Sequence, residues 1–410
     1  MDDAPAARIT AGAYPGRVRA PSTEPAAARV WPLYAGGFLG PFGGAMVIPM
    51  LPELRDGLHT TLGVAAAALT VYMIPFASLM VVSGTLAERW GRRRTVRLAY
   101  LVYALASVGC MLAPGAGTFL AGRALQGAAN AFTTPILVAA ISDLVSGPQL
   151  GRALGRYGSL QAAGQGFAPL VGGLAAAVNW RWAFAATVLA ALALATRPPQ
   201  DAPPPQIILS SRQRWRSLAD ARLALTCLIA ALLYLTALGV TTLCALLAGD
   251  RFGLGPDRRG LVVAVFGAAG LVGGGIIGRQ LDRLGIRRFG VAGVLALGAG
   301  AALAGWSPNL PVLISALALG GAAGTAGRVA VNSMAVRSVP DNRGGAASLT
   351  LACQFLGGAL APVLLIPVYH RNDTLSLVGA GATCLLAAVI LALAPARLLP
   401  LVKQTDPAAA

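Results

Sequence analysis

Two arginines lie inside long apolar stretches of this 410-residue sequence, where an ionic side chain is costly to bury. Arg123 falls within the first two turns of one stretch, and Arg328 lies inside another. A guanidinium in such a place is paired, extends its stem to the membrane interface, or performs a function. Arg123 would lie roughly 7–8 Å deep, which is shallow enough to reach the interface. From the residues alone, a functional charge and an interfacial one both remain open.

The acidic residues form no comparable site. None of the 15 falls in the middle of an apolar stretch, and the nearest ones, Glu53, Glu88, Asp143 and Asp282, stand at the ends of such stretches. An enzyme embedded in a membrane would need Ser, His, Asp, Glu or metal ligands grouped within these stretches. The sequence shows no such group, so we expect no enzyme, no cofactor and no metal. The five cysteines lie in apolar runs without metal-ligand spacing, and we interpret them as buried small side chains.

A charged segment at residues 84–94 returns in altered form at residues 278–288. Six positions match in kind at an offset of 194 residues: Gly84 and Gly278, Glu88 and Asp282, Arg89 and Arg283, Gly91 and Gly285, Arg93 and Arg287, and Arg94 and Arg288. Each copy lies between apolar runs and is predicted to be a short loop that joins two membrane helices. One copy alone would indicate only a topology signal. Two copies at a fixed offset favour duplicated halves and a structural or gating role.

The elements that position these residues are predicted to be membrane-spanning helices. Apolar residues make up 56% of the chain and charged residues 11%, well under the roughly 25% of a soluble domain. A net charge of +17 would suggest nucleic acid as the partner of a soluble chain, but here the basic residues lie between apolar spans, which excludes that partner. The predicted spans, six on each side of a proline-rich linker, are 31–51, 60–83, 98–113, 118–142, 157–178, 182–196, 223–248, 260–278, 289–306, 311–336, 344–368 and 374–394.

The predicted fold class is therefore an all-α membrane protein with twelve transmembrane helices in two pseudo-symmetric six-helix bundles. The predicted units are a tail at 1–30, bundles at 31–196 and 223–396, a linker at 197–222 and a tail at 397–410. The linker is either a solvated loop or, in its second part, an interfacial helix with Trp215 at headgroup depth. Loops on the side of the N-terminus carry 24 Arg and Lys and the opposite loops six, which predicts cytoplasmic termini. The use of 31 Arg against one Lys suggests a GC-rich bacterial genome and hence a bacterial plasma membrane.

Three motifs resemble the major facilitator superfamily and, within it, the twelve-helix drug/proton antiporter branch. Residues 84–94 are similar to the superfamily's signature between its second and third helices, with Glu88 where Asp is usual. Residues 123–127, Arg-Ala-Leu-Gln-Gly, resemble the fourth-helix motif of proton-coupled members. Residues 164–173 resemble the antiporter motif of the fifth helix, with Ala168 in place of a glycine.

The resemblance implies roles for three groups of residues. The coupling group is Arg123, Gln126 and Gly127, which favours a functional Arg123. The cytoplasmic gate comprises Gly84, Glu88, Arg89, Gly91, Arg93, Asp143, Asp282 and Arg283. In that gate an arginine of the loop would pair with Asp143, and Glu88 would face the helix N-terminus near Gly344 and Gly345. The bendable fifth helix contains Gly164, Ala168, Pro169, Gly172 and Gly173, for which close packing without any bearing on transport is the alternative.

The resemblance also implies a secondary transporter with a substrate cavity at the midplane and alternating access by rocking of the bundles. We expect a monomer that exports a small hydrophobic or amphiphilic compound, such as an antibiotic, with a proton gradient as the driving force. Without a mid-membrane carboxylate, neutral or anionic substrates match better than cations. An uptake permease or facilitator for a sugar or another small metabolite is the alternative. The polar residues expected to reach the cavity, or else to bond between helices, are Gln126, Asn130, Gln161, Gln165, Tyr234, Asn332 and Gln354.

Overall fold

The computed structural model of the chain is built from helices and describes residues 26–145, 148–200, 216, 218–339 and 342–393. Within these ranges, the side chains at 26–29, 85, 88, 148, 150, 151, 274–284 and 343 lie outside the description. The helices before the linker are α1 (Ala26–Ala45), α2 (Leu51–Gly57), α3 (Leu62–Trp90), α4 (Arg92–Met111), α5 (Ala116–Ala131), α6 (Thr134–Leu144), α7 (Pro148–Val178) and α8 (Arg181–Ala195). The helices after it are α10 (Ala221–Asp250), α11 (Pro256–Leu284), α12 (Ile286–Gly305), α13 (Leu310–Ser338), α14 (Arg343–Tyr369) and α15 (Asp373–Leu393). A single turn of 3₁₀ helix, η1 (Ile48–Met50), lies between α1 and α2.

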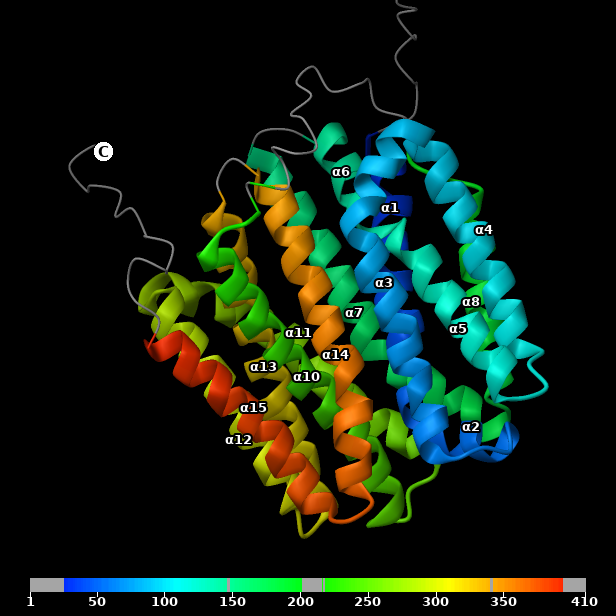
Figure 1. Cartoon of the computed structure of the whole chain (residues 1–410), viewed down its shortest axis with the longest axis vertical. Helices are drawn as coiled ribbons and strands as arrows, with labels where there is room; N and C mark the ends of the chain where they lie inside the picture. Colours follow the sequence, from blue (N-terminus) through cyan, green and yellow to red (C-terminus); the bar gives the residue numbers. More distant parts are fainter. Residues whose placement is uncertain (1–25, 146–147, 201–215, 217, 340–341, 394–410) are drawn as a thin grey trace, which may run out of the picture.

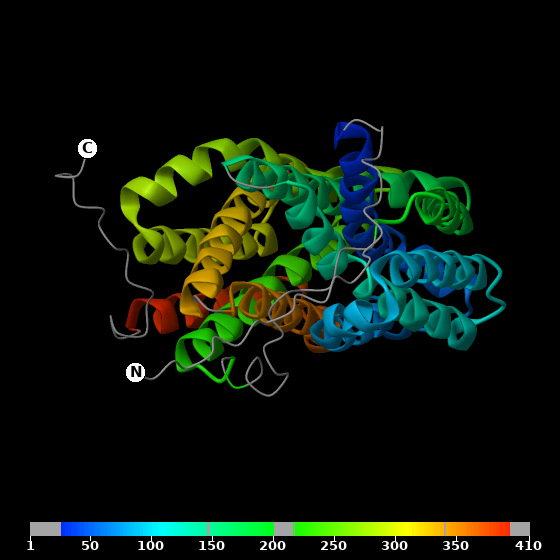
Figure 2. The ribbon, with the colours of Figure 1, turned by 90° about the horizontal axis from the view of Figure 1, so that it is seen from above.

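Two helical bundles lie side by side, one formed by α1–α8 and the other by α10–α15 (Figures 1 and 2). Two long seams join them: α7 packs along α11, and α3 packs along α14. The predicted linker and the two predicted tails fall mostly outside the described residues. A site shared by both halves must therefore lie between these two seams.

The repeated charged segment forms a sharp turn in each half. Helix α3 continues through Trp90 and α4 begins at Arg92, so only Gly91 separates them, and Gly285 separates α11 from α12 in the same way. Both glycines have positive φ angles, 85° and 76°, which residues with a Cβ rarely adopt. The prediction of a short loop is wrong in its length, since a single residue makes the connection. The backbone nevertheless repeats at the 194-residue offset, as duplicated halves require.

Two predicted spans are broken in the structure. The first continues from α1 through η1 into α2, whose first turn contains Pro52, so its predicted end at residue 51 is wrong and the helical structure extends to Gly57. The fourth is divided into α5 and α6 at Phe132 and Thr133, just before Pro135. Both breaks have the same cause. Proline interrupts a continuous helix because it lacks an N–H group, but it is well accepted in the first turn of a new one.

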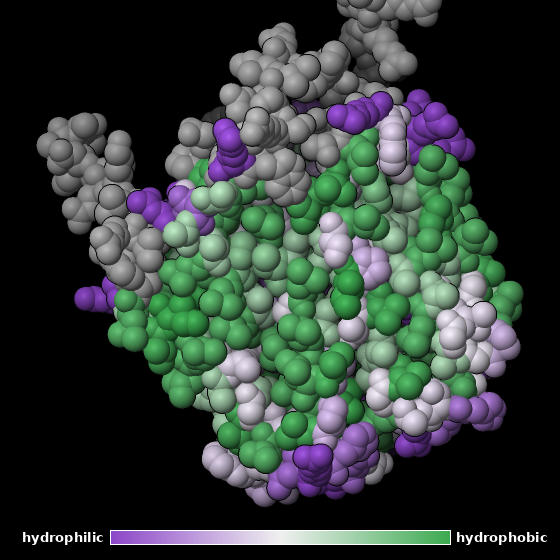
Figure 3. All heavy atoms as spheres, viewed as in Figure 1, coloured by the Kyte–Doolittle hydropathy of each residue, from purple (hydrophilic) through white to green (hydrophobic). Residues whose placement is uncertain are grey.

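The surface and the helix lengths are those of a multi-pass membrane protein. Eight stretches within the described residues are long and apolar enough to cross a membrane. The other main helices, α4, α7, α8 and α11, are shorter or carry arginines near one end. Figure 3 shows a broad apolar band with polar residues gathered at the two ends of the molecule. The order of the helices follows the predicted spans, while the count of twelve spans stays a prediction.

Candidate substrate site

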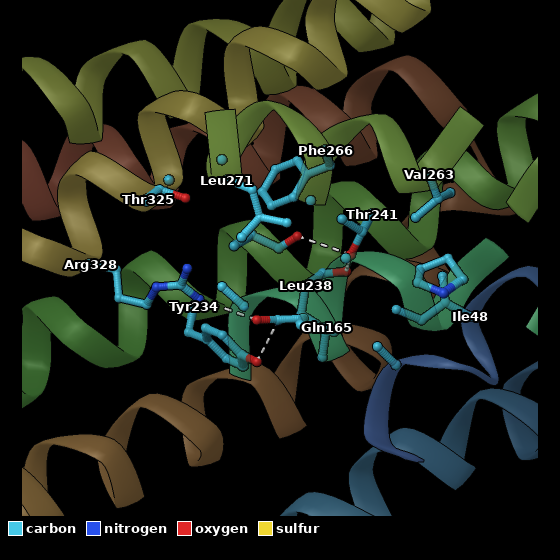
Figure 4. Close-up of a pocket in the computed structure, with 18 of the residues that line it drawn as sticks. Ile48, Gln165, Tyr234, Leu238, Thr241, Val263, Phe266, Leu271, Thr325 and Arg328 are labelled. Carbon is cyan, nitrogen blue, oxygen red and sulfur yellow. Dashed lines mark hydrogen bonds between the residues drawn. The ribbon is translucent and has the colours of Figure 1, made fainter. Parts of the chain in front are cut away.

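A cavity lies between the two bundles, near the middle of their helices (Figure 4). Both halves line it, through η1 and the helices α1, α7, α10, α11, α13 and α14. Its polar side chains are Gln165 of α7, Tyr234 and Thr241 of α10, Thr325 and Arg328 of α13, and Gln354 of α14. The described lining includes no carboxylate. A few polar groups in an otherwise apolar pocket are typical of a small-molecule site, because they fix the orientation of a ligand whose area is mostly buried against apolar atoms.

Gln165 connects the two halves within this cavity. Its side-chain amide donates a hydrogen bond to the Tyr234 hydroxyl at 2.8 Å, and its carbonyl oxygen accepts one from Arg328 Nη1 at 3.2 Å (Figure 4). Gln165 belongs to the first half, whereas Tyr234 and Arg328 belong to the second. A guanidinium has five N–H donors, and this bond uses one of them. Arg328 therefore supplies the cavity with a positive charge and with donors for a further acceptor.

The remainder of the cavity wall is apolar and close. It includes Phe266, Val263 and Leu271 of α11, Leu238 of α10 and Ile48. The cavity volume is about 60 Å³, room for about two water molecules and far below the roughly 300 Å³ of the smaller ligand pockets. In this conformation the site is too narrow for a drug-sized compound. The walls must move apart to admit one.

The seam between α7 and α11 beside the cavity consists of backbone contacts between glycines. A Cβ added to Gly166 would lie 3.0 Å from the Cα of Gly267, and a Cβ added to Gly173 would lie 3.0 Å from the Cα of Gly260. A Cβ on Gly260 would also lie 2.4 Å from the Pro169 carbonyl oxygen. Small residues permit such close approach of membrane helices. At these points backbone atoms of the two halves meet directly, without interlocking side chains.

Polar contacts join the halves on the side of the molecule where α2 lies (Figure 1). Glu53 of α2 forms an ion pair with Arg259 of α11, and the Arg259 side chain is almost completely buried. The Thr70 hydroxyl of α3 donates a hydrogen bond to the Ala359 carbonyl of α14 at 2.7 Å. These contacts hold the two halves together on that side of the molecule.

Arg123 lies inside the first half and not at the cavity. Its side chain is fully buried, with Nη1 donating to the Gly43 carbonyl at 2.9 Å and to Gln126 Oε1 at 2.8 Å. Its Nε donates to the Ala68 carbonyl at 3.3 Å, and its guanidinium carbon lies 4.4 Å from the centroid of the Tyr72 ring. Carbonyl oxygens and an aromatic face thus replace a carboxylate as the partners of this charge. The alternative in which Arg123 reaches the interface is wrong.

Three of the seven predicted cavity residues line the cavity: Gln165, Tyr234 and Gln354. The other four do not line it in this conformation, namely Gln126, Asn130, Gln161 and Asn332. Gln126 donates to the Ser107 hydroxyl of α4 at 2.7 Å, and Asn130 donates to the Tyr72 hydroxyl of α3 at 3.0 Å, so both follow the interhelical alternative. Asn332 is exposed on α13. The assignment of these four residues to the cavity is therefore corrected for this conformation.

Arg328 is the main cavity residue that the sequence analysis noted inside an apolar stretch but did not assign to the cavity. The signal was present, since a basic residue inside a predicted span is costly and marks a candidate site. The sequence did not indicate in which direction the Arg328 side chain points. Its neighbours on α13 are Ala, Gly and other apolar residues, which define no polar face of the helix.

The predicted gate residues are only partly described. An arginine of the turn does pair with Asp143, but it is Arg92, which the prediction did not name, and the pair ties α4 to α6 within the first half. The side chains of Glu88, Asp282 and Arg283 lie outside the described residues. The N-terminus of α14, where Glu88 was expected, is capped by Asn342, whose Oδ1 accepts a hydrogen bond from the Gly345 N–H at 3.1 Å.

The small residues of α7 serve two faces of the helix. Cβ atoms added to Gly164 and Gly172 would lie 2.3 Å from the Phe38 carbonyl oxygen and 1.9 Å from that of Met46, both in the first half. Gly173 and Pro169 instead contact α11 across the seam. Ala168 is fully buried between these two faces. The predicted close packing of this helix is therefore observed, and its bearing on transport stays a prediction.

Comparisons with known proteins agree with this arrangement. The model of the Major Facilitator Superfamily matches residues 33–256 and 226–409. A puromycin resistance protein of Streptomyces alboniger is 33% identical over 141 residues, which are 34% of this chain and 28% of that protein. The methylenomycin A resistance protein of Streptomyces coelicolor is 35% identical over 133 residues, 32% of this chain and 28% of that protein. These matches thus span just over a quarter of each relative.

A solved structure shows the same fold over almost the whole chain. It is a bacterial homologue of the human lysosomal transporter Spinster, in an inward-facing and unoccupied conformation. The TM-score is 0.72 at 16% sequence identity, and the match covers 90% of this chain and 97% of that one. The protein described here is accordingly a multi-pass membrane protein, and its chain belongs to the Major Facilitator Superfamily.

Proposed function

We propose that the protein exports a small hydrophobic or amphiphilic compound, neutral or anionic, across a bacterial plasma membrane. The observation that carries this proposal is the cavity between the halves, where Gln165, Tyr234 and Arg328 meet within an apolar wall. The relatives named for resistance to puromycin and to methylenomycin A support an exported compound of the antibiotic type. The termini are proposed to be cytoplasmic, and the transporter to act as a monomer.

The charge of the cavity sets the proposed substrate class. Arg328 would repel a cation in this narrow space, because the surrounding medium has a low dielectric constant. An anion or a neutral acceptor would instead accept hydrogen bonds from the guanidinium N–H groups that Gln165 does not use. The apolar body of the compound would rest against Phe266 and Leu238. Selection therefore follows from one basic group and a hydrophobic surface, without a carboxylate that would attract cationic drugs.

Alternating access follows from the contacts between the halves. The bonds from Gln165 to Tyr234 and Arg328 cross the midplane, so they must break when the bundles separate. A bound substrate can accept the Arg328 N–H in place of Gln165, which offsets part of the cost of opening. The Glu53 to Arg259 ion pair on the far side must open for release to the outside.

A proton gradient is the proposed driving force, and Arg123, Gln126 and Gly127 are the proposed coupling group. Arg123 bonds to carbonyls of α1 and α3 from its place on α5, so a change in these bonds would move three helices relative to one another. A Cβ on Gly127 would lie 1.9 Å from the Tyr72 carbonyl oxygen, which shows how closely α5 and α3 approach. This group thus links the packing of the first half to the wall of the site.

Everted membrane vesicles test the proposal directly. Vesicles from a bacterium that expresses the chain and lacks its main drug exporters should accumulate at least one compound of a panel that includes puromycin and methylenomycin A. A protonophore should stop the accumulation, and vesicles with empty vector should show none. Accumulation in right-side-out vesicles instead would establish uptake and overturn the proposed direction. Transport that is unaffected by the protonophore would overturn the driving force.

A further inference from the structure

A groove on the outer surface of the first half lies apart from the substrate cavity. It runs between α3, α4 and the α5–α6 connection, has a volume of about 610 Å³, and is lined below its upper end by Leu98, Ala99, Val102, Leu125, Ala128, Ala129 and Phe132. Leu98 and Leu125 are exposed, so this apolar surface faces lipid and not another helix. The groove is therefore shaped by protein but open to the bilayer.

Basic and aromatic residues stand at the end of this groove where α3 ends and α4 begins. Arg89 and Trp90 come from the end of α3, and Arg94 comes from the first turn of α4. Both arginines are exposed, and Figure 3 shows polar residues gathered at this end of the molecule above the apolar band. Trp90 stacks on Phe132 with ring centroids 6.3 Å apart and is itself 57% exposed. A tryptophan beside arginines is the arrangement found at headgroup depth.

The length of the groove fits one leaflet. On α4 it extends from Arg94 to Val102, eight residues or about 12 Å at 1.5 Å per residue. A hydrocarbon core of roughly 30 Å gives about 15 Å to each leaflet. The acidic residue Asp143 nearby is already paired with Arg92, so it does not neutralise the two arginines of the groove.

We propose that this groove binds an anionic phospholipid, with the phosphate held by Arg89 and Arg94 and an acyl chain along α4 and α5. The occupant is a lipid and not a free phosphate. A free phosphate would contact only the arginines, whereas a lipid would also cover the apolar wall below them. Two basic contacts predict an enrichment of roughly 5- to 30-fold over a zwitterionic lipid of the same chain length.

Quenching of Trp90 by brominated lipids tests this site. The full chain, with Trp31, Trp180, Trp182, Trp215 and Trp306 replaced by Phe, is reconstituted in phosphatidylcholine that contains a small fraction of brominated phosphatidylglycerol or of brominated phosphatidylcholine. Brominated phosphatidylglycerol should quench Trp90 at a 5- to 30-fold lower mole fraction. The double change Arg89→Gln and Arg94→Gln should remove this difference. Arg288→Gln, which changes an exposed arginine at the matching position of the second half, should preserve it.

The unaltered chain provides a second measurement that does not depend on the tryptophan replacements. Native mass spectrometry of protein purified from mixed phosphatidylglycerol and phosphatidylcholine should show one retained phosphatidylglycerol more than the Arg89→Gln, Arg94→Gln protein. Equal quenching by both lipids, or equal retention by both proteins, would overturn the proposal and leave the groove as ordinary contact surface for bulk lipid.

Discussion

Arg123 and Arg328 are both charged residues in apolar helices, yet they are held in different ways. Arg123 is enclosed by carbonyls and a ring within one half, whereas among the described residues Arg328 donates one hydrogen bond, to Gln165 of the opposite half. The first arrangement fixes the positions of three helices. The second leaves donors available at the site where the halves meet.

Replacing Arg328 with Gln should abolish export of anionic compounds while leaving the protein in the membrane. The loss of one charge-assisted hydrogen bond, about 1.5–3 kcal/mol, corresponds to roughly a 10- to 150-fold fall in affinity. Arg328→Lys should retain part of the activity, since the charge remains but the planar fork is lost. Rates in everted vesicles at equal expression provide the measurement, with Asn332→Ala on the exposed side of α13 as control. An undiminished rate for Arg328→Gln would remove this residue from the site.

Replacing Arg123 with Ala should abolish export for a different reason. The Gly43 carbonyl, in the last turn of α1, would lose its Arg123 donor, at a cost of about 1–3 kcal/mol if it is left unpaired, and the Ala68 carbonyl of α3 would lose its contact with α5. Arg123→Lys should rescue only in part, because an ammonium cannot reach both carbonyls with the same geometry. Drug tolerance and membrane level, measured on the same cells, give the result. Full tolerance of the Arg123→Ala cells at wild-type protein level would contradict a coupling role.

The sequence indicates depth in the membrane better than it indicates direction. Gln165, Tyr234 and Gln354 do reach the cavity, but Gln126 and Asn130 lie at comparable positions along their helix and point into the first half. The 3.6-residue period of a helix reveals its buried face only where polar and apolar residues fall on different sides of the helix. Helices made of Ala, Gly and Leu that touch both protein and lipid give little such contrast. The direction of a side chain then depends on packing that only the structure shows.

At the scale of helices, the predicted spans follow the order of the helices in the structure, but several of them are too short. Helix α7 begins at Pro148, nine residues before the predicted span at 157–178, and α3 continues to Trp90. Apolar run length measures the hydrocarbon core, whereas a helix stops only where its backbone turns. In the repeated segment that turn is Gly91, which the sequence had placed inside a longer loop.

Close approach between helices predicts which glycines tolerate a methyl group. Gly172→Ala should lower the unfolding temperature by a few degrees, because its Cβ would lie 1.9 Å from the Met46 carbonyl oxygen and overpacking costs about 1–3 kcal/mol. Gly109→Ala on α4 is the matched control, since its Cβ would meet nothing within 4 Å. That control should be neutral or slightly stabilising, because Ala favours helix over Gly by roughly 0.5–1 kcal/mol. Thermal unfolding in detergent compares the two, and equal transitions would argue against a tight contact at Gly172.

At the scale of the whole molecule, the Glu53 to Arg259 ion pair is expected to act as a latch between the halves. Glu53→Gln would leave the nearly buried Arg259 without its counter-charge. Because the Glu53 side chain is partly exposed, the closed contact should be destabilised by about 1–3 kcal/mol, less than the roughly 3–5 kcal/mol of a fully buried pair. A change of that size alters the ratio of two conformations by roughly 5- to 150-fold. The mutant should therefore populate a conformation open on the side where α2 lies.

Spin labels at Asp56 and Arg258, both exposed and on opposite halves, report this opening in a protein without its native cysteines. The distance distribution should move to longer values in Glu53→Gln. The charge exchange Glu53→Arg with Arg259→Glu should restore the shorter distances. Identical distributions in all three proteins would show that the pair does not control the conformation.

The seam between α7 and α11 has a consequence for how such a transporter evolves. Its contacts at Gly166 with Gly267 and at Gly173 with Gly260 involve no side chains, while the neighbouring Gln165 faces the cavity. Gly166 and Gly267 also line the cavity, so a larger residue at either position would change the cavity wall and the seam together. Substitutions at the other lining residues would leave these glycine contacts intact. One inherited seam can therefore serve successive generations of the protein as their spectrum of exported compounds diverges.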